Sequence, residues 1–170
     1  MNETPTMTSE RIMTTAPTTF PRRVDGRPGQ QHGADGHPGA ASNTVIRTLD
    51  LADTDATGRH HNSVIMRWVE ACEAGLWKKH GLIDVFPCAP RVQHLINYVA
   101  PMSFDEHVSV SVGVASVGRT SMTFFFEVTS LSEGRHGSVV AHGTFTVVNM
   151  PDGSEHPQPW SERVRTALLG

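Results

Sequence analysis

The hydrophobic and polar residues of this chain follow two different periods. From about residue 62 to residue 80, apolar residues recur every three or four positions, which predicts one amphipathic helix of about five turns. Gly81 follows as a C-terminal stop. The predicted buried face carries Val64, Ile65, Trp68, Val69, Cys72 and Leu76, and the opposite face carries Arg67, Glu70, Ala74 and Lys78.

After this helix the period changes to two. Apolar residues alternate with small or polar ones in 108–115, 121–128 and 139–148, and shorter strand candidates lie at 45–49 and 91–100. One strand, a long helix and four further strands predict an α+β fold, with a five-stranded antiparallel sheet packed on one face by the helix. One helix cannot cover both faces and the edges of such a sheet. We therefore expect a second subunit to cover what remains.

The composition changes near residue 44. Residues 1–43 hold only 10 apolar residues together with 5 Gly, 5 Pro and 7 Thr, whereas 49 of the 107 residues in 44–150 are apolar. A segment that buries so little apolar surface cannot offset its ordering entropy. We predict a disordered tail over 1–43, one folded domain over 44–150, and a C-terminal tail over 151–170 with a possible short helix at 161–169.

Charge, cysteine usage and hydropathy exclude several classes of protein. The net charge is −3, which argues against a nucleic-acid partner, and no apolar run is long enough to cross a membrane. The N-terminus lacks a secretory pattern, so we expect a cytoplasmic protein. Cys72 and Cys88 form no CxxC pair, and the ten His residues are scattered. We expect no metal and no other cofactor.

The segment between the first strand and the helix, Asp53-Thr54-Asp55-Ala56-Thr57-Gly58-Arg59-His60-His61-Asn62, is denser in polar residues than a turn requires. It combines a pair of carboxylates with a helix N-terminus, whose free N–H groups stabilise negative charge. A carbonyl oxygen held there would be stabilised as an oxyanion, while Asp55 attacked its carbon or activated water. The pattern indicates acyl transfer. The alternative is that both aspartates form turns and that Asn62 is only an N-cap.

Two blocks of sequence resemble the hotdog-fold thioesterases of the 4-hydroxybenzoyl-CoA thioesterase and acyl-CoA thioesterase family. That family characteristically has Asp-x-Asp-x-x-Gly, then Asn, then a long helix containing Glu. The first block here is Asp53-x-Asp55-x-x-Gly58, then Asn62, Glu70 and Gly81-Leu82. The second is Asn97-Tyr98-Val99-Ala100-Pro101, then Asp105, Val108 and Val110, then Val117-Gly118-Arg119-Thr120-Ser121. The resemblance spans about residues 45 to 150.

The resemblance implies a curved antiparallel sheet wrapped around the helix, dimers or tetramers of identical chains, and hydrolysis of an acyl-CoA or acyl-carrier-protein thioester. Asp55 matches the catalytic carboxylate, as nucleophile or general base, and the amide of His61 or Asn62 would be the oxyanion donor. The substrate-binding candidates are Gly58, Arg59, His60, His61, Glu70, Tyr98, Arg119, Thr120 and Ser121.

The chain departs from the usual family pattern at three positions. Arg59 stands where many relatives have His, His61 replaces the first residue of an Asn pair, and Ile65 replaces an aromatic residue. Glu70 shares a less apolar helix stripe with Met66, Glu73 and Trp77, a stripe that could line a pocket shared between subunits. Arg91, Arg119, Lys78 and Lys79 are candidates for coenzyme A phosphates or for a carrier protein. The competing functions are a hotdog dehydratase acting on a 3-hydroxyacyl thioester and a non-catalytic thioester-binding module.

Overall fold

The computed structural model describes residues 40–169, so the tail expected over 1–43 lies outside the described residues as far as residue 39. The predicted order of one strand, a long helix and four strands is confirmed, and the helix begins and ends where its period indicated. The elements are β1 (Ser42–Thr48), η1 (Leu51–Asp53), α1 (Ser63–Lys79), η2 (Phe86–Cys88), β2 (Arg91–Tyr98), β3 (His107–Val117), β4 (Ser121–Ser130), β5 (Val139–Val148) and α2 (Glu162–Leu169).

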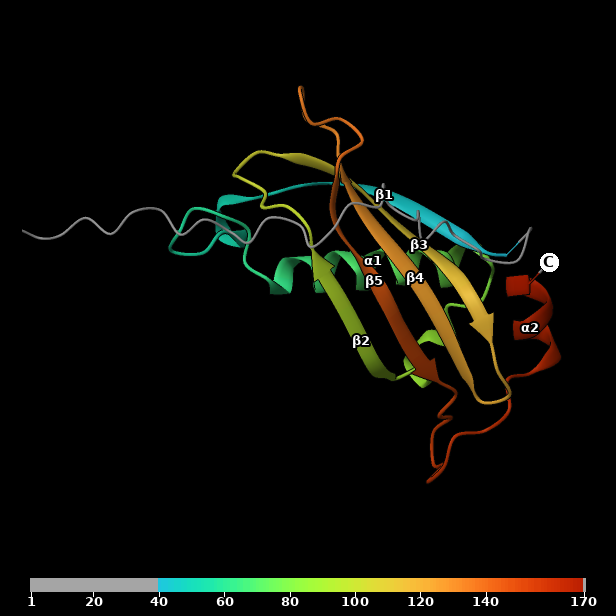
Figure 1. Cartoon of the computed structure of the whole chain (residues 1–170). Helices are drawn as coiled ribbons and strands as arrows, with labels where there is room; N and C mark the ends of the chain where they lie inside the picture. The colour runs from blue at the N-terminus through green and yellow to red at the C-terminus, as the bar shows by residue number, and fades with distance from the viewer. Residues whose placement is uncertain (1–39, 170) are drawn as a thin grey trace, which may run out of the picture. The chain divides into compact units, whose positions relative to one another are not determined.

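The five strands form one sheet in the order β1-β3-β4-β5-β2, and every neighbouring pair is antiparallel. The α+β prediction is therefore confirmed. The strands that adjoin in sequence, β3, β4 and β5, also adjoin in the sheet, whereas β1 and β2 lie at the two edges (Figure 1). Only η2 lies between α1 and the edge strand β2 in the chain.

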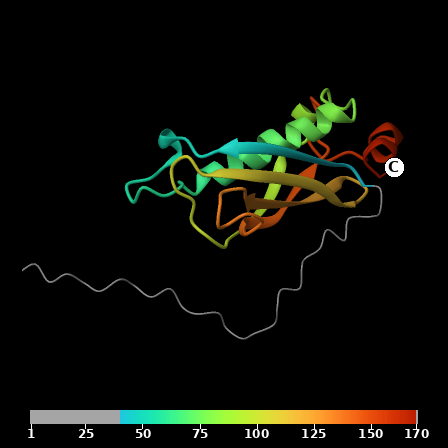
Figure 2. The same ribbon diagram turned by 90° about the horizontal axis from the view of Figure 1, so that it is seen from above.

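The helix α1 covers one face of this sheet (Figure 2). The six residues of its predicted apolar face are all buried. They meet the inward-facing residues of the strands, among which the rings of Phe124 and Phe145 stack with centroids 4.9 Å apart. Trp77 extends this aromatic cluster, with its ring centroid 6.1 Å from that of Phe124. The core lies between the helix and the three central strands.

The other face of the sheet is lined mainly by small and polar side chains, with the aromatic Phe125 among them. In β4, for example, Thr123, Phe125 and Glu127 alternate with three buried residues. Phe125 lies across Gly113 of β3, where an added Cβ would come within 2.4 Å of the ring. The absence of a side chain at Gly113 therefore leaves room for the Phe125 ring. The face has no layer packed on it among residues 40–169, as expected for a fold with one long helix.

The C-terminal segment packs on the domain. Trp160 is buried against Trp77 at a centroid distance of 6.1 Å, and α2 buries Val164 and Leu168. The amide of Ala41 donates to the carbonyl of Leu168 at 2.9 Å. Contacts at the N-terminal and C-terminal ends of the domain thus extend the packed region beyond residues 44–150, the range expected from composition. At the N-terminal end, β1 begins at Ser42.

Cys72 and Cys88 are both free thiols. Over the described part of the chain, no helix has the length and apolar character required to span a membrane.

Candidate active site

The Asp55 carboxylate lies at the surface, in a tight turn of the loop between β1 and α1. Its Oδ1 accepts two hydrogen bonds from Thr57, one from the amide at 2.7 Å and one from the hydroxyl at 2.5 Å. These bonds, the hydroxyl one first, lower the pKa of Asp55. The turn role considered for this residue is therefore present, but it uses only one carboxylate oxygen. Oδ2 has no hydrogen-bond partner within residues 40–169.

The loop is folded by its own backbone. The amide of Asp55 donates to the carbonyl of Arg59 at 2.8 Å, and the amide of Gly58 donates to the carbonyl of Asp55 at 2.9 Å. Gly58 has φ of 73°, and no atom lies within 4 Å of a Cβ placed there. Glycine is thus needed for the left-handed backbone rather than for close approach to a ligand. Asp53 fixes the loop to α1 through an ion pair with Arg67.

The start of α1 leaves one amide free. The amide of His61 donates to the carbonyl of Asp53 at 2.8 Å, so this amide is not available to a substrate. Asn62, the N-cap residue, makes no side-chain capping bond. Instead His61 caps the helix, since its Nδ1 accepts from the amide of Ser63 at 3.2 Å. Among the described residues, the Asn62 amide has no partner, which makes it the better oxyanion donor of the two considered.

Tyr98, at the end of β2, reaches across to the helix start. Its hydroxyl donates to the carbonyl of Asn62 at 2.8 Å. Its ring lies 6.0 Å from the ring of His60. The structure thus brings together Asp55, His60, Asn62 and Tyr98, from two segments that are separated by the whole helix.

The ring of His60 is held in one tautomer. The backbone amide of Met102 donates to its Nδ1 at 3.0 Å, so the proton of the neutral ring is on Nε2. Burial lowers the pKa of His60, and the nearby carboxylates of Asp55 and Glu106 oppose this only in part. His60 is therefore a neutral side chain that can donate one hydrogen bond beside the loop.

Other predicted site residues lie elsewhere. Arg119, Thr120 and Ser121 form the turn from β3 to β4, at the opposite end of the sheet from the loop that follows β1. The 11 residues of β3 separate the two ends by about 35 Å. One chain does not bring this turn to Asp55. Glu70 is exposed near the middle of α1, two turns beyond Asn62. No three His, Cys, Asp or Glu residues in 40–169 are grouped as a metal site would require.

The less apolar stripe on α1 is only half exposed. Met66 and Glu70 are exposed, but Glu73 and Trp77 are buried, at 1% and 0% exposure. Glu73 forms an ion pair with Arg91 of β2 and accepts a hydrogen bond from the Trp77 indole at 3.2 Å. Burial raises the pKa of Glu73, against the lowering effect of Arg91.

Arg91 is therefore turned inward. Its guanidinium lies 4.3 Å from the centroid of the Phe145 ring, a cation–π distance. The suggestion that Arg91 meets coenzyme A phosphates does not fit this position. Spacing along the sequence had placed Glu70 and Glu73 on one stripe, but no local signal linked Glu73 to Arg91, 18 residues further on.

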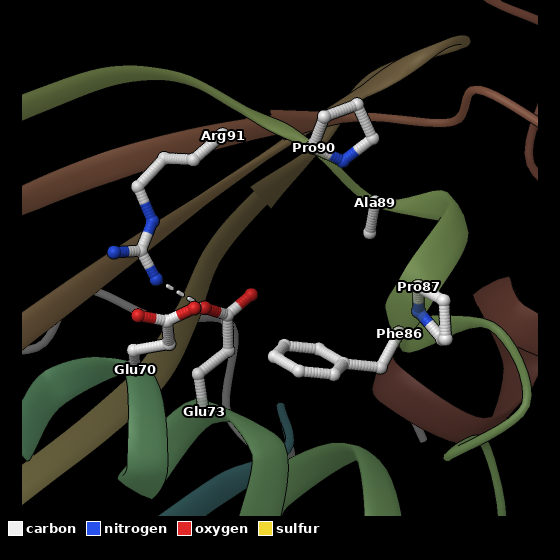
Figure 3. A pocket seen from close by; sticks show the side chains of 7 residues that line it. All are labelled: Glu70, Glu73, Phe86, Pro87, Ala89, Pro90 and Arg91. Carbon is white, nitrogen blue, oxygen red and sulfur yellow. Dashed lines mark hydrogen bonds and ion pairs between the residues drawn. The ribbon is translucent and has the colours of Figure 1, made fainter. Parts of the chain in front are cut away.

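A cavity of about 430 Å³ opens between α1 and the segment that leads into β2. Figure 3 shows the carboxylates of Glu70 and Glu73 directed toward Arg91, with the Phe86 ring facing them from the other side. The lining is completed by Pro87, Ala89 and Pro90.

Comparisons with known proteins find one family match and several similar folds. Residues 57–135 match the family described as "Thioesterase superfamily". The fold is similar to that of a predicted thioesterase from Bacillus stearothermophilus, with a TM-score of 0.67 at 25% identity over 75% of this chain and 94% of that chain. A search of curated protein sequences finds no match.

Two further solved structures share the fold. One is 4-hydroxybenzoyl CoA thioesterase from Pseudomonas sp. strain CBS-3, with a TM-score of 0.67 at 20% identity over 75% of this chain and 99% of that one. The other is a thioesterase complexed with coenzyme A and Zn from Thermus thermophilus, with a TM-score of 0.66 at 21% identity over 76% and 93%. The chain thus has the hotdog fold, and its residues 57–135 are similar to the thioesterase superfamily.

Proposed function

We propose that this protein hydrolyses the thioester of an acyl group carried on coenzyme A or on an acyl carrier protein. The observation that carries the proposal is that one loop holds a carboxylate with a free oxygen, on Asp55, and an unpartnered helix-start amide, on Asn62, inside a fold similar to that of thioesterases. The names of the structural neighbours support a thioester substrate, since one of them is complexed with coenzyme A.

In the proposed reaction the thioester carbonyl oxygen lies against the Asn62 amide, where the N-terminus of α1 stabilises the developing negative charge. Asp55, through the oxygen not used by Thr57, attacks the carbonyl carbon as a nucleophile or removes a proton from the attacking water. Collapse of the tetrahedral intermediate expels the thiolate, which leaves as the free thiol after protonation. If Asp55 is the base, the oxygen of the attacking water stays in the released acid. If Asp55 is the nucleophile, water then hydrolyses the acyl–Asp55 anhydride, which releases the acid and restores the carboxylate.

Several side chains around this pair have proposed supporting roles. His60 donates through Nε2 and orients water or the substrate. Tyr98 fixes the carbonyl of Asn62, and with it the backbone beside the proposed oxyanion amide. Gly58, Arg59 and His61 shape the loop, while Glu70 lines the acyl side of the site.

We also propose that the active form is a homodimer or a homotetramer. β2 is an edge strand, and it exposes Val92 at 60%, Leu95 at 55% and Tyr98 at 47%. An exposed apolar edge is a pairing surface, and a copy of the same strand is its simplest partner. A second chain also supplies a way for Arg119, Thr120 and Ser121 to reach a site on the first. The cytoplasmic location expected from the sequence stays a prediction.

The test is a free-thiol assay of the purified protein over short, long and aromatic acyl-CoA thioesters and over carrier-bound thioesters, with 3-hydroxyacyl thioesters included. We expect thiol release from at least one saturated thioester. Formation of an alkene from 3-hydroxyacyl thioesters without thiol release would contradict the proposal in favour of a dehydratase. Tight binding of coenzyme A with no turnover of any thioester would contradict it in favour of a binding module.

A further inference from the structure

The cavity beside Glu73 lies at the far end of a seam between α1 and β2. The seam is anchored at one end by the hydrogen bond from Tyr98 to Asn62 and at the other by the ion pair of Arg91 with Glu73. Asn62, Met66, Glu70 and Glu73 are spaced by four, four and three residues, so they follow one side of the helix. The seam therefore leads from the proposed oxyanion amide to the cavity.

The opposite wall of the seam comes from β2. Its side chains with buried partners on β5 face the helix, and the register pairs His94 with Phe145 and Tyr98 with Ala141. His94 lies between the two anchors, and both of its ring nitrogens are buried without a hydrogen-bond partner in the described structure. Burial lowers the pKa of His94, as does the nearby Arg91. The strand wall is thus apolar near Tyr98 and becomes polar toward Arg91.

The cavity at the end of the seam carries an excess of negative charge. Glu70 and Glu73 contribute two carboxylates, and Arg91 contributes one positive charge. Glu73 is committed to Arg91 and Trp77, whereas no residue of 40–169 bonds to the Glu70 carboxylate. Glu70 is therefore the free acceptor of the cavity, and an anionic ligand group would be repelled there.

From these observations we infer that the cavity binds the distal end of the acyl group, and that it selects acyl groups ending in a hydrogen-bond donor, a hydroxyl or an ammonium group. The inference rests on the proposed function and specifies its substrate class. Eight residues of helix separate Asn62 from Glu70, a length of about 12 Å along the axis. An extended acyl chain of roughly ten carbons covers this distance.

The test compares four coenzyme A thioesters of equal chain length whose last carbon carries a methyl, hydroxyl, ammonium or carboxylate group. We expect kcat/KM, measured by thiol release, to be at least about fivefold higher for the hydroxyl and ammonium thioesters than for the methyl one, and lowest for the carboxylate. A higher kcat/KM for the methyl or the carboxylate thioester would overturn the inference.

Substitution of Glu70 makes the test specific. Because Glu70 is exposed, its replacement leaves the core unchanged. Glu70→Gln is expected to abolish the advantage of the ammonium thioester, and Glu70→Lys to make the carboxylate thioester better than the ammonium one. Glu133→Gln, in the exposed turn between β4 and β5, is the matched control and should keep the wild-type order. An unchanged order in Glu70→Lys would overturn the inference.

Two outcomes separate this inference from the proposed function. Hydrolysis of all four thioesters at equal rates contradicts the inference alone. If no thioester is hydrolysed, the proposed function fails, and calorimetric binding of the four matching free acids decides the inference by the same expected order. A Glu70→Gln variant that weakens binding of coenzyme A itself would assign the cavity to the carrier rather than to the acyl group, and would also overturn it.

Discussion

The two ends of the seam between α1 and β2 differ in how their polar residues are paired. At the start of the helix, Asp55 and Asn62 are exposed, and each keeps at least one polar atom without a partner in the described structure. Three turns further on, Glu73 is buried and its carboxylate is paired with Arg91 and Trp77. A polar residue on this helix is therefore not by itself evidence of chemistry. What separates the two ends is whether hydrogen-bonding capacity is left over for a substrate.

The largest expected effect is a fall in kcat when the free amide of Asn62 is removed. Asn62→Pro deletes the N–H, and the φ of −55° at this position suits proline. We expect kcat to fall by about 10²–10³-fold, the usual effect of losing one oxyanion donor.

Asn62→Ala is the matched control, because it keeps the amide and removes only a side chain that makes no capping bond. Its kcat should stay near that of the wild type. Equal rates for the two variants would show that the amide is not the oxyanion donor.

At the buried end of the seam, around Glu73, substitutions should change the free energy of unfolding rather than the rate of hydrolysis. Glu73→Ala leaves Arg91 without its partner over the Phe145 ring, and we expect a loss of about 3 kcal/mol in the free energy of unfolding. Glu70→Ala, one turn away on the exposed side, should change it by less than about 0.5 kcal/mol. Urea denaturation of both variants measures the contrast, and similar losses would mean that Glu73 is not the more strongly held residue.

A smaller effect is expected where the two segments of the site meet. Tyr98→Phe removes the hydroxyl that donates to the Asn62 carbonyl but keeps the ring beside His60. Loss of one such bond should lower kcat/KM by about three- to tenfold. The melting temperature is expected to change little because Tyr98 is half exposed, so a large fall in it would assign Tyr98 a structural role instead.

The smallest expected effect is a shift of the acidic limb of the pH–rate profile. The proposed reaction requires the ionised carboxylate of Asp55, so activity should be lost as the pH falls through its pKa, and the hydroxyl of Thr57 lowers that pKa. Thr57→Val removes this bond, raises the pKa of Asp55, and should move the acidic limb to higher pH. A profile of kcat against pH for both proteins tests this, and a shift to lower pH would contradict the assignment.

The sequence predicted well the features that follow from local periodicity. The helix and the strands could be found because apolar residues repeat at 3.6 and at two residues. The loop of Asp55 stood out since it holds more polar side chains than a turn needs. Features that depend on contacts between distant segments could not be found in this way.

Three residues illustrate that limit. The spacing placed Glu73 beside Glu70 on one stripe of the helix. In the structure Glu73 is buried and forms an ion pair with Arg91, at the start of β2. Trp77 is covered by Trp160, from a segment expected to be a tail. Asn62 had the residue type of an N-cap, yet the His61 side chain makes that bond. In each case the contact that a side chain makes depends on local geometry or on tertiary packing. The spacing of residues along the sequence does not encode either.

The central claim, that the open start of α1 is the catalytic centre, is tested most directly by the rate of thiol release from the best acyl-CoA substrate in Asp55→Asn. We expect kcat to fall by at least about 10³-fold, because the amide can neither attack the thioester nor remove a proton from water. The melting temperature should be unchanged, and Asp152→Asn, a surface control, should keep wild-type activity. A folded Asp55→Asn protein that keeps its full rate would contradict the account.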